Sequence, residues 1–163
     1  MKKTLLTGLL MTALCVLDAK TAEAQDAFLL IPGIPGDSLR VRYEGWIDVV
    51  SLAQGFDRTL KGASACTVLV GKGLDKAGPL LWAAAVTGQT FATIQIDILR
   101  AGVSAQKYYE LTLNNAAIVT INTQPLDLLE TLTIGGTSAT LKYFPQKPDG
   151  SLGNPVEATA TCK

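Results

Sequence analysis

The most constraining feature of this sequence is a strict alternation of apolar and polar residues in two segments. In TIQIDIL, at 93–99, three isoleucines alternate with polar side chains, and YYELTLN, at 108–114, repeats the pattern. A strand places successive side chains on opposite faces, so a period of two predicts half-buried β-strands. We expect the apolar faces to build a core. The opposite faces carry Asp97 and Glu110, which we expect to be solvated.

Further strand-like segments are separated by turn-forming residues. They are AFLLI at 27–31, GWIDVVSL at 45–52, CTVLVG at 66–71, AAIVTIN at 116–122, LETLTI at 129–134 and ATLKYF at 139–144. Pro–Gly and Gly–Gly pairs lie between several of them, and Asn114-Asn115 is expected to turn one strand into the next. Many short strands with such punctuation are typical of all-β proteins.

One segment, DKAGPLLWAAAVTG at 75–88, predicts a helix. Pro79 suits a first helical turn, Gly88 suits the position after the last turn, and the alanines between them favour helix. The segment is apolar nearly all round, so we expect it to be covered on more than one side. The predicted fold is mainly β: a compact antiparallel β-barrel of two sheets with one short flanking α-helix.

The first 24 residues have the layout of a secretory signal peptide. Lys2 and Lys3 precede an uncharged run of 14 residues, and Ala22-Glu23-Ala24 fits a signal peptidase site. The alternatives are a membrane anchor or a buried first helix, but the run is short for a bilayer span. We therefore expect a signal peptide at 1–24, a single domain at 25–163, and an exported protein that is periplasmic or secreted.

Cleavage would remove Cys15 and leave two cysteines in an oxidising compartment. Cys66 and Cys162 then allow one internal pairing, and a structural disulfide is expected between them. Two free thiols are the alternative. Such a bond would fasten the end of the chain, which otherwise frays.

The residues give little support for catalysis. The chain has no histidine, which removes the commonest general base and metal ligand, and two cysteines make no zinc cluster. A Ser104–Lys107 dyad and carboxylate pairs are weak candidates, the carboxylates being Asp48, Asp97, Glu110 and Glu157. The segment VGKGLDKAG lacks the ending of a phosphate-binding loop. We expect no enzyme activity and no cofactor or metal.

Charge limits the partners as well. Removing residues 1–24 takes three lysines and two acidic residues from a balanced total of 14 and 14, so the mature chain is close to neutral. Without a basic block, nucleic acid is a poor partner. A second long apolar run is also missing from the sequence, so the mature chain is not expected to insert into a membrane.

Five segments in order resemble one family. They are AFLLIPGIPGDS, YEGWIDVVSLAQG, LDKAGPLLWAAAVTG, RAGVSAQKYYELTLNNAAIVT and FPQKPDGSLGNPVEA. The series is similar to the haemolysin-coregulated protein, Hcp, the tube subunit of bacterial type VI secretion. The resemblance implies a β-barrel of two sheets with a flanking helix, homohexameric rings that stack into a tube, and effector proteins carried in the lumen.

The resemblance also assigns family-motif positions. These are Gly45, Trp46, Ile47, Pro79, Arg100, Ala101, Gly102, Asp149, Gly150, Pro155, Val156 and Glu157. Trp46 is expected in the core, Pro79 at the helix entry, and Asp149-Gly150 in a turn. Gly78 stands where the family has serine, and the ending TATCK replaces the usual Gly-Trp-Asp.

The signal-like segment separates this chain from cytoplasmically assembled tube subunits. The sequence therefore predicts a non-catalytic, ring-forming structural protein, with an exported monomeric barrel that acts as a binding module as the alternative. In a ring, the disulfide has a second alternative, which is a bond between neighbouring subunits.

Overall fold

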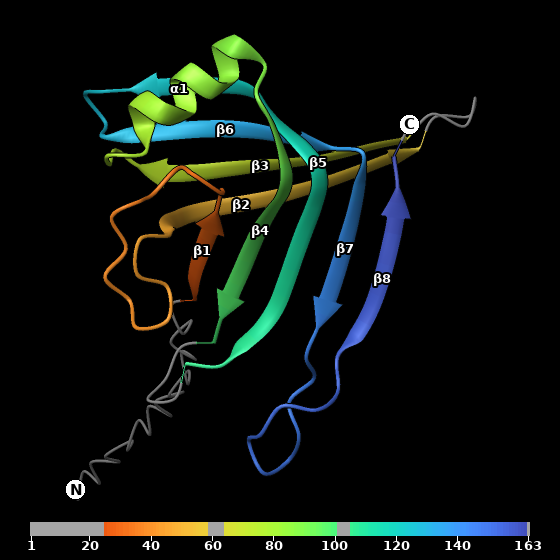
Figure 1. Cartoon of the computed structure of the whole chain (residues 1–163). Coiled ribbons are helices and arrows are strands. Elements are labelled where there is room, and N and C mark those ends of the chain that lie inside the picture. Colours follow the sequence, from red (N-terminus) through yellow and green to blue (C-terminus); the bar gives the residue numbers. More distant parts are fainter. Residues whose placement is uncertain (1–24, 59–63, 101–104, 163) are drawn as a thin grey trace, which may run out of the picture.

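The computed structural model describes residues 25–58, 64–100 and 105–162 (Figure 1). The predicted signal peptide lies outside these residues. The elements are β1 (Asp26–Leu30), β2 (Ile47–Arg58), β3 (Ser64–Gly73), α1 (Gly78–Thr87), β4 (Thr90–Leu99), β5 (Lys107–Gln124), β6 (Leu129–Gly136), β7 (Ser138–Tyr143) and β8 (Val156–Thr161). The predicted helix and all the predicted strand segments are found in these elements. The segments 108–114 and 116–122 form the single strand β5, and β2 continues to Arg58, well past its predicted end at residue 52.

Six strands close into an antiparallel barrel. Their order is β4-β1-β2-β3-β6-β5, and pairing between β4 and β5 closes the ring. Strands β7 and β8 continue the sheet beyond β5 as a two-stranded extension, which we call the wing. In Figure 1, β2, β3 and β6 run roughly horizontally, whereas β1, β4 and the two strands of the wing run roughly vertically. The predicted barrel with two sheet layers and one helix is confirmed.

Strand β5 joins the two layers. Its first half pairs with β4 on one side and β7 on the other, and its second half pairs with β6. The change of neighbours falls near Asn115, which has a positive φ of 48°. The predicted turn at Asn114-Asn115 is therefore wrong: asparagine tolerates the left-handed conformation, and here it bends a continuous strand rather than ending it.

The core fills the space between the layers and under the helix. It contains the isoleucine face of β4 and the leucine face of β5, with Ile94, Ile96, Leu111 and Leu113 fully buried. Leu81 of α1 and Ile134 of β6 belong to the same cluster. Trp46 is half-buried and packs on a smaller cluster of Phe28, Tyr43 and Leu99 at the other end of the barrel.

Helix α1 forms where the sequence predicts it. Pro79 occupies its first turn and Gly88 ends it with a positive φ of 64°, which glycine adopts without strain. Its buried residues are Gly78, Leu81 and Ala84. The expectation that it is covered on more than one side is wrong for the single chain, because only this face packs on the barrel.

Candidate assembly surfaces

A buried ion cluster anchors α1 to the barrel. Lys72 is 0% exposed, and its Nζ lies 2.6 Å from Glu130 Oε2 and 2.7 Å from Asp75 Oδ1. Its Nζ also donates to the Gly73 carbonyl, and Thr123 donates to the other oxygen of Glu130. A buried charge is tolerated only when it is paired and hydrogen-bonded, and this cluster meets both conditions.

The same cluster explains the glycine at the start of the helix. A Cβ on Gly78 would lie 2.9 Å from Glu130 Oε1, so the carboxylate occupies the space that a side chain would need. By the family resemblance, glycine stands here in place of serine. The sequence alone gave no reason for this exchange, because Glu130 is far away along the chain. Lys72 and Asp75 lie in the VGKGLDKAG segment, and they form this structural cluster with Glu130.

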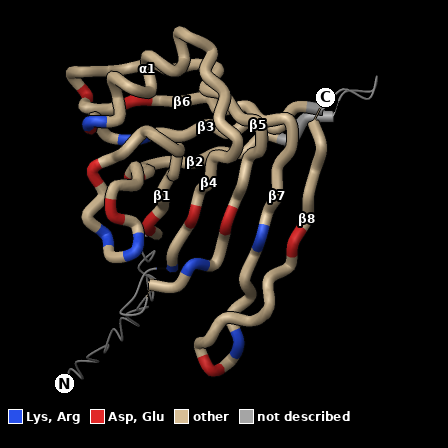
Figure 2. Tube along the Cα trace, viewed as in Figure 1, with Lys and Arg blue, Asp and Glu red and all other residues tan. Residues whose placement is uncertain are grey.

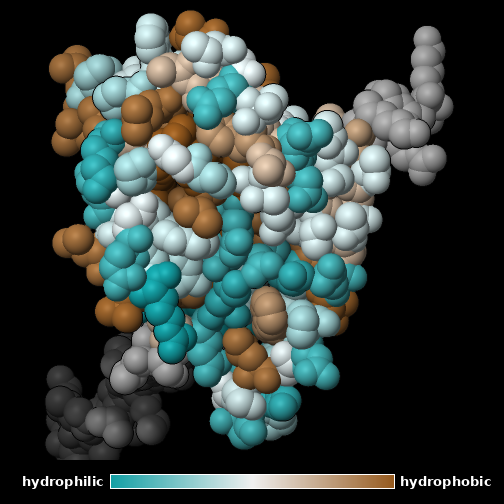
Figure 3. All heavy atoms as spheres, viewed as in Figure 1, coloured by the Kyte–Doolittle hydropathy of each residue, from teal (hydrophilic) through white to brown (hydrophobic). Residues whose placement is uncertain are grey.

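The outer face of α1 is apolar and exposed. Trp82 is 59% exposed and Val86 66%, and Leu80 is exposed beside them. Brown spheres gather at this end of the molecule in Figure 3. A cluster of large apolar side chains on the surface is typical of a protein interface.

A row of charges crosses the outer face of the other layer. Asp97 on β4 pairs in register with Glu110 on β5, which pairs with Lys142 on β7 and then Glu157 on β8. Figure 2 shows this row of acidic and basic positions along the four strands, and Figure 3 shows a hydrophilic band there. Lys142 lies 3.2 Å from Glu110 and 3.9 Å from Glu157, so the row links the barrel to the wing.

The prediction that Asp97 is solvated is wrong. It is 3% exposed, because Tyr43 from the loop after β1 covers it and donates to its Oδ2 at 3.0 Å. Gln95 donates to the other oxygen at 2.9 Å, and Lys107 Nζ lies at 3.2 Å. Burial, followed by the negative charge of Asp97, raises the pKa of the Tyr43 hydroxyl. The hydroxyl therefore stays protonated and keeps donating.

Glu110 and Lys107 stabilise each other's charge. Burial acts to raise the pKa of Glu110, but its contacts with Lys107 and Lys142 outweigh burial and lower it. Burial likewise acts to lower the pKa of Lys107, but the carboxylates of Glu110 and Asp97 raise it. A catalytic general acid needs the opposite, a raised carboxyl pKa. The carboxylates at 97 and 110 therefore form a structural ion network.

The fold does not assemble the remaining catalytic candidates into a site. Asp48 is exposed on β2, where it pairs in register with Phe28, and Phe28 separates it from Asp97. Ser104 of the considered dyad lies outside the described residues. Lys107 is engaged by the two carboxylates. The described residues hold no group of three or more His, Cys, Asp or Glu able to bind a metal.

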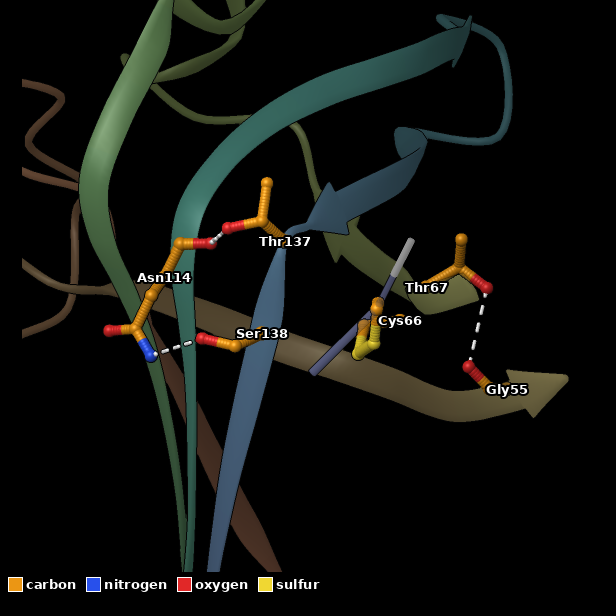
Figure 4. The surroundings of a disulfide bond; sticks show 7 residues. Gly55, Cys66, Thr67, Asn114, Thr137 and Ser138 are labelled. Atoms are coloured by element: carbon orange, nitrogen blue, oxygen red, sulfur yellow. Dashed lines mark hydrogen bonds between the residues drawn. A yellow bond between two sulfur atoms is a disulfide. The ribbon is translucent and has the colours of Figure 1, made fainter. Parts of the chain in front are cut away.

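The predicted cysteine pair lies where the two layers meet the wing. The structure joins Cys66 of β3 to Cys162, just after β8, with 5.7 Å between the Cα atoms. Cys66 is 2% exposed, and the backbone N–H of Cys162 donates to the Thr137 carbonyl at 2.8 Å. Figure 4 shows the bond among residues of β2, β3, β5 and β7. Both partners belong to one chain here.

The family-motif positions mostly serve turns and element ends. Gly45 and Gly150 have positive φ values of 77° and 83°, as tight turns require. Asp149 accepts hydrogen bonds from the N–H and hydroxyl of Ser151, which fixes the second of these turns. Ile47 begins β2 and is fully buried.

The other motif positions lie around the wing. The Arg100 guanidinium stacks on the Tyr108 ring at 5.0 Å and donates to Gln146. Pro155 precedes β8, in which Val156 and Glu157 are exposed. Ala101 and Gly102 lie outside the described residues. None of the described motif residues forms a catalytic arrangement.

A small closed antiparallel barrel with one ion-anchored helix and a two-stranded wing is the class of fold that these elements define. The model of the family described as "Type VI secretion system effector, Hcp" matches residues 28–143. The chain therefore belongs to the Hcp family, and its fold is that of the type VI tube protein. None of the helices in the described part is long and apolar enough to cross a membrane.

Solved structures share this fold. Hcp1 from Salmonella typhimurium superposes with a TM-score of 0.72 at 19% identity, covering 85% of this chain and 94% of that one. A structure of a type six secretion system protein gives 0.75 at 22% identity, with 85% and 96% covered. A type VI secretion system effector from Yersinia pestis gives 0.70 at 19%, with 83% and 99% covered. A comparison with curated proteins finds no match.

Proposed function

We propose that the mature chain is an exported, non-catalytic structural protein that closes into a homohexameric ring of the Hcp type. The observation that carries this proposal is the exposed apolar face of α1, with Leu80, Trp82 and Val86. The barrel already packs against the buried face of the helix. The outer face therefore has no partner among the described residues. A second copy would cover it.

The wing offers a different surface for the other side of such a contact. Strand β8 pairs with β7 and leaves its other edge without a neighbouring strand in the described part of the chain. Exposed strand edges favour pairing with another chain. A head-to-tail interface needs two unlike surfaces on one subunit, and it closes into a ring when the rotation between copies closes. Stacked rings and effectors held in the lumen follow from the family resemblance.

The test is the solution mass of the exported chain by light scattering at micromolar concentration. We expect about six times the monomer mass, because the family resemblance implies a closed ring of six copies. Trp82→Ser should shift the mass toward the monomer, because it removes apolar area from the helix face. Leu126→Ser, which changes an apolar side chain that is even more exposed and lies on the β5–β6 hairpin, is the control. A monomer under oxidising and reducing conditions would overturn the ring and favour the monomeric binding module.

Export has a separate test. N-terminal sequencing of the soluble protein from its host should read from Gln25. Soluble protein that retains Met1 would contradict the signal peptide and place the cysteines in a different redox setting.

A further inference from the structure

The edge strand β8 has little of its own to hold it in place. All six of its residues are exposed, so it adds almost no apolar area to the core. Among the described strands it pairs with β7 alone. An edge strand that buries no side chain gains little from packing, so β8 belongs to the least stable part of this fold.

The side-chain contacts of β8 are also weak. The hydroxyls of Thr140 and Thr159 share a hydrogen bond at 3.0 Å, and Lys142 lies 3.9 Å from Glu157. Both pairs are in contact with solvent, where such interactions contribute little. Cys162 is different: it packs against the main core cluster, and its sulfur bonds Cys66 inside that cluster.

The disulfide connects strands that are not neighbours. In the sheet order, β6, β5 and β7 stand between β3 and β8. The bond therefore spans from one barrel layer to the free end of the wing rather than reinforcing an existing ladder. Without it, β8 keeps its ladder with β7, and Cys162 keeps the hydrogen bond from its N–H to the Thr137 carbonyl. Detachment of β8 would make β7 the edge and uncover Ala139, which is buried in the intact wing.

We infer that the Cys66–Cys162 disulfide is a redox lock that decides which strand edge the chain presents to a second copy. In the oxidised chain, β8 is docked and forms the edge. In the reduced chain, β8 opens and that edge is lost. The inference rests on the proposed self-association, and it adds a condition to it: assembly through the wing requires the oxidised chain.

The chemistry is thiol–disulfide exchange with an external disulfide. One thiolate of the pair attacks that disulfide and forms a mixed disulfide, releasing one thiol. The second thiolate then displaces the other half, forming the Cys66–Cys162 bond and a second thiol. The two protein thiols are oxidised, and the external disulfide accepts the two electrons and two protons. An exported chain meets such an oxidant, whereas reducing conditions before export keep β8 unlocked.

Hydrogen exchange read by mass spectrometry tests the lock on the exported chain, oxidised and after reduction with dithiothreitol. We expect amides of Val156–Thr161 to lose nearly all their protection in the reduced chain. Those of β3 and β6 should stay well protected, although less strongly, because reduction also lowers the free energy of global unfolding. Cys162→Ser should match the reduced chain in both buffers, because it removes the bond and leaves Cys66 in the core. Unchanged β8 exchange, or β8 amides that stay as protected as those of β3 and β6 in the reduced chain, would overturn the lock.

Light scattering on the same samples separates this inference from the ring itself. We expect assembled oxidised chain and mostly monomeric reduced chain and Cys162→Ser variant. Reduced chain that assembles as well as oxidised chain contradicts the lock but supports the ring. Oxidised chain that is monomeric at every concentration overturns the ring, and with it the role of the lock in self-association, even if β8 exchange still responds to reduction.

Discussion

The helix end of the barrel and the wing are stabilised by different kinds of interaction. Under α1, strands β3, β5 and β6 bury aliphatic side chains together with a fully paired Lys72–Glu130 cluster. In the wing, β8 has no buried residue and is held by a ladder, an exposed ion pair and one disulfide. The difference shows that closure of the barrel stabilises one region through burial, whereas the outer strand of the wing, β8, depends on covalent and polar links.

The largest expected effect comes from breaking the buried cluster. Lys72→Ala would leave Glu130 and Asp75 close together without their cation, which costs about 3 to 5 kcal/mol when one partner of a buried pair is removed. Urea unfolding followed by circular dichroism measures it. Lys76→Ala, which breaks the exposed pair with Asp37, is the matched control and should leave the transition in place. Equal losses of stability in the two variants would contradict the claim that the buried cluster stabilises the helix end more than an exposed ion pair does.

The wing is tested by removing its covalent link. Cys162→Ser opens a loop closed across 96 positions of sequence and should lower the free energy of unfolding by about 2 to 4 kcal/mol. The cause is a less constrained unfolded chain. Urea unfolding of oxidised protein measures the loss, and adding reductant should lower the oxidised wild-type chain to the level of the variant. A variant as stable as oxidised wild type would show that the bond constrains nothing.

A smaller effect is expected at the other end of the barrel. Tyr43→Phe removes the hydrogen bond to the buried Asp97 carboxylate, which keeps its contacts with Gln95 and Lys107. Hydrogen bonds to charged groups contribute about 1.5 to 3 kcal/mol, and the remaining contacts place this loss at the lower end. Thermal unfolding measures it. Tyr143→Phe, at a more exposed ring, is the control and should unfold at the wild-type temperature.

The smallest effect concerns the junction between barrel and wing, and it depends on pH. The pKa of Glu110 is below its usual 4.5 in the folded chain, so its charged form stabilises the fold above that pH. The contribution is lost as pH falls through the lower folded value, because both states are then protonated. Glu110→Gln should therefore be less stable than wild type at pH 7 and equally stable near the acid limit. Urea midpoints across this range measure the difference, and a constant difference would contradict the ion network.

Much of the fold could be predicted from local pattern. The alternation in residues 93–99 and 108–114 fixed which faces form the core, because a strand has a period of two. Pro79 and Gly88 marked the ends of α1 through their backbone preferences. With Cys15 set aside in the predicted signal peptide, only one internal cysteine pairing was available, although free thiols or a bond between subunits stayed open as alternatives. These features need no knowledge of distant neighbours, so the sequence by itself determined them.

Other features depend on residues far apart in sequence. Asp97 looked solvated, but the loop with Tyr43 packs over it, 54 positions away. Lys72 and Glu130 are 58 positions apart and carried no local sign of their partnership. Asn115 bends β5 instead of ending it because the second half of the strand finds β6 as a neighbour. Only the tertiary structure decided these points, since burial and charge pairing are set by which strands meet when the barrel closes.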